Sequence, residues 1–133
     1  MKNLKKRKFA YKAATTQFAS MRDTENGIVF LSENTTGLAF NPNIQLMELH
    51  GRIKKKFFGS NHMRVSLLKY QFCASVNPVR YDTFDIIGAK ELETMVQTHI
   101  ENGSPFLELY VKFSRKDEGP QRSTYVPVQR VET

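Results

Sequence analysis

Cysteine and long apolar runs are scarce in this sequence. Cys73 is the single cysteine among 133 residues, which excludes an internal disulfide. With three scattered histidines it also leaves too few ligands for a Cys/His zinc site, so we expect no metal and no cofactor. No apolar run is long enough to cross a bilayer, and the Lys-rich start lacks the apolar stretch of a secretory signal. These absences favour an intracellular protein that is neither secreted nor membrane-bound.

Acidic residues are also in the minority. The chain has 13 Asp and Glu against 20 Lys and Arg, a net charge of +7. Such a balance favours contact with nucleic acid, an anionic membrane or an acidic protein surface, without choosing among them. Hydrophobic residues make up 40% of the chain and aromatic residues 11%, enough for one small domain with a modest core.

The first twelve residues contain no acid and six basic side chains: Lys2, Lys5, Lys6, Arg7, Lys8 and Lys12. Mutual repulsion predicts that much of residues 2–12 is extended. We place a basic arm at residues 1–22, in which aromatic residues favour a first strand or helix over 8–21. Lys5, Lys6, Arg7 and Lys8 are candidates for phosphate binding or nuclear import, and a plain solvated arm is the alternative.

A hairpin and a helix follow the arm. Asn26-Gly27 predicts a tight turn, residues 28–31 a strand, the polar stretch 32–37 a break, and residues 38–40 a resumed strand. A helix is expected from residues 41–43, with an Asn cap and Pro42 in the first turn. Its apolar face has helical spacing: Leu46, Leu49, Ile53 and Phe57.

The second half repeats the hairpin and helix. Residues 63–74 and 80–87 alternate like two paired strands. Gly88 opens a second helix that Asn102-Gly103 closes, and its predicted apolar stripe is Leu92, Met95, Val96 and Ile100. Residues 106–113 predict a buried last strand that includes Phe106, and residues 114–133 a flexible polar tail.

This ββαββαβ order predicts an α+β fold with a mixed sheet and both helices packed on one face. The β-grasp, or ubiquitin-like, architecture has this arrangement. We place the domain at residues 23–113.

Three segments carry a family resemblance: YDTFDI at 81–86, ELETMV at 91–96 and LELYV at 107–111. Residues 26–113 resemble the N-terminal ubiquitin-like (Phox/Bem-type) domain of plant Mutator-like (MuDR-type) transposases. The resemblance implies a domain that longer relatives join to a zinc-containing DNA-binding region and a catalytic domain. This sequence contains neither a Cys/His zinc spacing nor a carboxylate catalytic triad. We therefore expect a non-catalytic interaction module from a truncated or domesticated transposon protein, in the nucleus or the cytoplasm.

The resemblance also implies an acidic face for binding another protein domain or a second copy. Its matching residues are Asp82, Asp85, Glu91 and Glu93. A complementary basic face comes from the first helix, at Arg52, Lys54, Lys55 and Lys56. This segregation of charge favours protein association. The alternatives are ordinary solvated faces, or a nucleic-acid-binding module that uses the arm and the basic helix.

The sequence offers no catalytic constellation. Asp82 and Asp85 lie three apart on a strand, which sends them to opposite faces. His50 and His99 are expected to flank apolar stripes, and Cys73 to be a buried, inert thiol. We therefore expect no enzyme activity.

Overall fold

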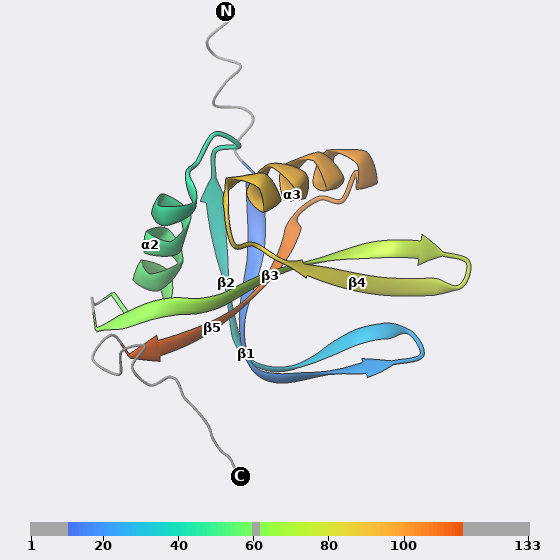
Figure 1. The fold of residues 1–133 in the computed structure, drawn as a ribbon, viewed down its shortest axis with the longest axis horizontal. Coiled ribbons are helices and arrows are strands. Elements are labelled where there is room, and N and C mark those ends of the chain that lie inside the picture. Colours follow the sequence, from blue (N-terminus) through green and yellow to red (C-terminus); the bar gives the residue numbers. More distant parts are fainter. Residues whose placement is uncertain (1–10, 60–61, 116–133) are drawn as a thin grey trace, which may run out of the picture.

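The computed structural model describes residues 11–59 and 62–115. Its elements, drawn in Figure 1, follow the order β1 (Tyr11–Thr24), β2 (Gly27–Phe40), α2 (Leu46–Phe57), β3 (Met63–Val76), β4 (Val79–Asp85), α3 (Ala89–Asn102) and β5 (Leu107–Arg115). The first strand thus begins within the predicted basic arm. Lys5, Lys6, Arg7 and Lys8 lie outside the described residues. Of the tail predicted for residues 114–133, Ser114 and Arg115 belong to β5, and the rest lies outside the described residues.

The five strands form one mixed sheet in the order β2-β1-β5-β3-β4. β1 and β5 run parallel at its centre, while β1 with β2, β3 with β5 and β3 with β4 are antiparallel. A single parallel bridge between Gly27 and Tyr81 joins β2 to β4 and closes the sheet into a barrel. The α+β class, the mixed sheet and the two helices predicted from the sequence are confirmed.

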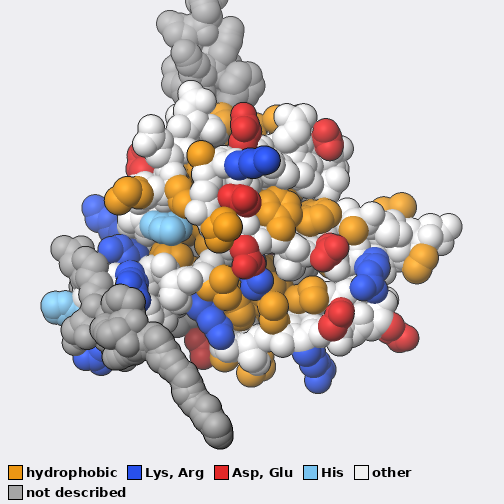
Figure 2. All heavy atoms as spheres, in the orientation of Figure 1, with side chains coloured by type: hydrophobic (Ala, Val, Ile, Leu, Met, Phe, Trp, Pro, Cys, Tyr) orange, Lys and Arg blue, Asp and Glu red, His pale blue; other side chains and the backbone are white. Residues whose placement is uncertain are grey.

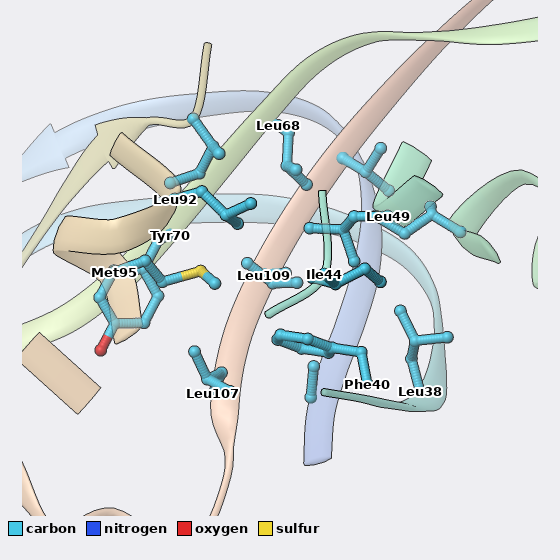
Figure 3. Close-up of a cluster of buried hydrophobic side chains, with 14 residues drawn as sticks. Leu38, Phe40, Ile44, Leu49, Leu68, Tyr70, Leu92, Met95, Leu107 and Leu109 are labelled. Atoms are coloured by element: carbon cyan, nitrogen blue, oxygen red, sulfur yellow. The ribbon is translucent and has the colours of Figure 1, made fainter. Parts of the chain in front are cut away.

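One apolar cluster joins both helices to the same face of the sheet (Figure 3). The alternating side chains of β5 at Leu107, Leu109 and Val111 are all buried, and they meet Leu49 of α2 and Met95 of α3 in this cluster. Both helices are therefore amphipathic elements whose apolar faces are held by a shared core.

The opposite face carries a smaller aromatic cluster from the β1–β2 hairpin. Phe30 stacks on Tyr110 with ring centroids 3.8 Å apart, and Phe18 meets the edge of Phe30 at 4.8 Å. The Lys112 ammonium lies 5.4 Å from the centre of the Phe18 ring, within the range of a cation–π interaction. These contacts hold the far part of the hairpin against β5.

The predicted break at residues 32–37 is wrong, because β2 is continuous through it. Residues 34–37 pair in register with β1, and the Thr16 and Thr35 hydroxyls are hydrogen-bonded across the strands at 2.8 Å. Strand pairing satisfies the backbone here and overrides the turn preference of a polar segment.

The predicted start of the first helix is also wrong. α2 begins at Leu46, and its N-cap Gln45 makes no side-chain cap bond. The Asn41 carbonyl instead accepts a hydrogen bond from the Ile44 amide at 3.0 Å, so Pro42 belongs to a turn before the helix. The predicted apolar face is confirmed, since Leu49 and Ile53 are buried.

α3 is rotated slightly from the predicted stripe. Leu92 and Met95 are buried as expected, but Ile100 is 56% exposed and His99 is buried in its place. Gly103 ends the helix in the left-handed region (φ 70°) and donates to the His99 carbonyl, as predicted. Phe106 was expected to be buried and is 45% exposed, because the alternation of β5 turns Leu107 inward and its neighbour outward.

Candidate functional site

The exposed end of α2 forms a basic surface against β2. Burial of Leu49 and Ile53 fixes the rotation of the helix, which leaves Arg52, Lys55 and Lys56 exposed. These three cations and Leu38 of β2 line a hollow of about 320 Å³. Three of the four residues predicted as the basic face are therefore brought together against one strand.

Arg52 also fixes the helix to the sheet. Its guanidinium donates a hydrogen bond to the Ala39 carbonyl at 2.6 Å. Because a charged donor makes a stronger bond than a neutral one, this contact holds the last turns of α2 along β2.

A second hollow of about 510 Å³ continues on the other side of β2, where Lys12, Ala14, Ala39 and Phe106 are among its lining residues. It shares Leu38 and Lys56 with the first hollow. Lys12 therefore belongs to the basic surface, although the sequence placed it with the arm. The signal that would have found it is the alternation of β1, which turns Lys12 and Ala14 to one side and buries Ala13 on the other.

Lys54, the fourth predicted cation, is half-buried and does not line either hollow. Its charge acts on His50, whose pKa is lowered below 6.5 mainly by burial and further by Lys54. Lys54 therefore belongs to the flank of the helix. We use the name basic groove for Lys12, Arg52, Lys55 and Lys56 with the two hollows.

The predicted acidic residues lie in different settings. Asp85 forms a salt bridge with Lys69 across the β3–β4 ladder. Asp82 is exposed on the opposite face of β4, as the alternation predicted, and accepts a hydrogen bond from the Thr83 amide.

The two glutamates lie on the first turns of α3. The Glu91 carboxylate reaches back toward Gly88, the N-cap residue, where the helix dipole favours a negative charge. Glu93 is exposed and lines a hollow of about 660 Å³ between α3 and the segment that leads into α2. The four carboxylates thus divide among separate surroundings, and Asp85 already has a counter-ion.

The basic groove carries no carboxylate among its lining residues. Figure 2 shows Lys and Arg side chains gathered over the α2 side of one face, whereas most Asp and Glu side chains spread over the α3 and β4 side. A surface with cations from both β1 and α2 and no acid in its lining attracts anionic groups.

The described residues show no centre for metal chemistry, since no three His, Cys, Asp or Glu side chains among them lie close enough to share a metal ion. Cys73 is only partly buried, contrary to expectation, and its thiol donates to the Ser75 carbonyl at 3.1 Å. His99 was expected beside the apolar stripe and is buried instead, with Tyr11 edge-on at 5.2 Å. Burial lowers the pKa of His99 below 6.5.

None of the helices within residues 11–59 and 62–115 is long and apolar enough to span a membrane. Comparison with protein-family models finds no match, and neither a curated protein nor a solved structure matches the chain. The class that the fold itself defines is a small α+β domain with a mixed sheet and two helices.

Proposed function

We propose that this protein is a non-catalytic association module that binds an acidic segment of a partner protein in its basic groove. The observation that carries the proposal is the convergence of Lys12, Arg52, Lys55 and Lys56 from β1 and α2 around β2, with no carboxylate in the lining. Complementary charge speeds encounter and selects partners, and it requires no pocket for a small molecule.

The proposal includes a β-grasp fold of the kind found at the N-terminus of Mutator-like transposases. The strand order β2-β1-β5-β3-β4 with a parallel central pair supports it, as does the ββαββαβ order of elements. The proposal also assigns the protein to the nucleus or the cytoplasm, as a truncated or domesticated transposon protein.

The structure favours a separate acidic partner over self-association. A second copy would have to offer its own acids, and of these Asp85 is paired with Lys69 while Glu91 lies at a helix start. Association of unlike surfaces therefore needs carboxylates that this domain does not gather in one place.

A charge reversal tests the proposal. We expect Lys55→Glu with Lys56→Glu to weaken binding of a Glu-rich peptide by at least roughly ten-fold, or about 1.4 kcal/mol, in titrations at low salt. Arg22→Glu with Lys90→Glu makes the same change in net charge at exposed positions outside the groove. Equal affinities of the two double variants, or binding that added salt does not weaken, would overturn the proposal.

Nucleic-acid binding is the second candidate, because the groove and the net charge of +7 would also attract phosphates. The test compares DNA and RNA retention by the whole chain and by a chain without residues 2–10, which keeps β1 complete. Loss of retention would assign the binding to the arm. Unchanged retention that disappears with Lys55→Glu and Lys56→Glu would assign it to the groove.

A further inference from the structure

The outer edge of β2 lacks a strand partner over most of its length. Within the described parts of the chain, β2 pairs with β1 on one side, and on the other side it meets β4 only at Gly27. The edge from Ile28 to Leu38 is therefore open to pairing with another chain, since an unpaired strand edge presents regularly spaced donors and acceptors.

The bond from Arg52 to Ala39 shows which backbone groups face outward. The Ala39 carbonyl accepts from α2, so it points away from β1. In a strand the N–H and C=O of one residue point to the same side, and the direction alternates along the chain. Because β1 and β2 pair without a register shift from Thr35 to Ala39, the backbone groups of Thr35 and Gly37 also face the open edge.

The two hollows of the basic groove flank this stretch of edge. On the helix side lie Arg52, Lys55 and Lys56, and on the opposite side Ala14, Gly37 and Ala39 border a shallow floor beside Phe106. The side chains of an added strand would alternate between these two sides. The helix side suits carboxylates, and the other side suits apolar groups of moderate size beside Phe106, with Lys12 also in its lining.

From this placement we infer that an extended acidic segment of a partner protein adds to β2 as a further strand, pairing at Thr35 and Gly37. Its carboxylates face the cations of α2, and its intervening apolar side chains face Phe106. Arg52 already occupies the Ala39 carbonyl, so pairing ends there. The inference rests on the proposed function and adds the conformation and the residue pattern of the partner.

Gly37 offers a matched pair of variants for the test. A Cβ built there meets nothing within 4 Å, so an Ala side chain has room. Pro removes an amide that faces the open edge and leaves the ladder with β1 intact, whereas Ala keeps the amide. With a probe peptide of alternating Glu and Val, we expect Gly37→Pro to bind roughly ten-fold more weakly than Gly37→Ala. Thermal unfolding of both variants reports whether each remains folded.

A second measurement leaves the protein unchanged. The same peptide with N-methylated backbone amides keeps its charges and loses its ability to pair as a strand. We expect it to bind more weakly than the parent peptide, and we expect the parent alone to slow hydrogen exchange at the Thr35 and Gly37 amides.

The outcomes separate the two claims. Equal, salt-sensitive binding of both peptides without slower exchange on β2 would overturn strand addition and leave the acidic-partner proposal standing. No salt-sensitive binding of either peptide would overturn the proposed function itself. If an RNA oligonucleotide is retained while neither peptide is, the inference is wrong.

Discussion

Lys69 on β3 and Asp85 on β4 form a cross-strand salt bridge in which the lysine side chain is 10% exposed and the aspartate side chain 44%. The pair lies on the face of the sheet away from the helices, since the neighbouring Tyr70 and Phe84 point into the aromatic contacts of the core. Asp85 therefore stabilises the sheet by neutralising the buried Lys69 ammonium group. A carboxylate that is already paired in this way is less able to bind a partner protein.

Asp85→Asn should destabilise the fold by about 1 to 2 kcal/mol, because it leaves the Lys69 ammonium buried without its counter-ion. Asp82→Asn is the control, since this exposed residue keeps its acceptor for Thr83 and should change stability by no more than about 0.5 kcal/mol. Urea unfolding of both variants measures the difference. Equal effects would show that the salt bridge contributes nothing to stability.

Gly27→Ala should open the barrel. Gly27 has φ 111°, and a Cβ there would lie 2.1 Å from the Tyr81 carbonyl oxygen, so the bridge between β2 and β4 has to move apart. We expect a loss of about 2 to 3 kcal/mol and faster hydrogen exchange at the Tyr81 amide, which now donates to the Asn26 carbonyl. Gly37→Ala, where a Cβ meets nothing, is the matched control. Slow exchange at Tyr81 in Gly27→Ala would contradict this reading.

The fold should lose stability in mild acid. Burial lowers the pKa of His99 and of His50 in the folded state, with Lys54 adding to the effect on His50. The unfolded chain then binds protons first as the pH falls below about 6.5, so the free energy of unfolding decreases as the solution becomes more acidic. At a pH well above about 6.5, both histidines are neutral in the folded and the unfolded chain, and the free energy of unfolding no longer depends on them.

His99→Phe tests the acid prediction, because it keeps a ring against Tyr11 and removes the titrating group. The slope of stability against pH between about 6.5 and 5 should be smaller in this variant than in the wild type. Denaturant midpoints across this range give the slope. A wild-type slope in His99→Phe would mean that this histidine does not limit acid stability.

Tyr70 and Tyr110 should lose their phenolic protons at a higher pH than an exposed tyrosine. Burial, followed by the charge of Glu108, raises the pKa of each to about 12, and a hydrogen bond to Glu108 contributes further at Tyr110. The unfolded chain loses these protons from about pH 10, so stability should fall between pH 10 and 12. Glu108→Gln should lower the pKa of both phenols, most of all at Tyr110. Absorbance titration of tyrosinate in Glu108→Gln and Tyr110→Phe checks the assignment, and identical curves for wild type and Glu108→Gln would contradict it.

Local patterns in the sequence were sufficient to predict the parts of the fold that depend on short-range physics. The spacing of Leu49 and Ile53 predicted the buried face of α2, and Asn102-Gly103 predicted the end of α3. Helical periodicity and the left-handed preference of glycine act within a few residues, so they can be read without knowing the partner elements.

The features that were missed depend on partners far along the chain. Thr35 lies in a polar stretch that resembles a loop, and it becomes strand because β1 offers a complete ladder. Ile100 and His99 exchange places because the packing of α3 against β3 and the contact with Tyr11 fix the helix rotation. Each of these features depends on a contact between residues far apart in the sequence, which a short stretch of sequence does not reveal.

For the candidate site, too, some features follow from the sequence alone and others from the tertiary structure. The sequence by itself determined the excess of positive charge and the cluster Arg52, Lys55 and Lys56 on one helix. Only the tertiary structure added Lys12 to that cluster, paired Asp85 with Lys69 and placed the cations along the open edge of β2. The physical reason is that charges interact through space over a few ångströms, and chain folding sets those distances independently of separation in the sequence.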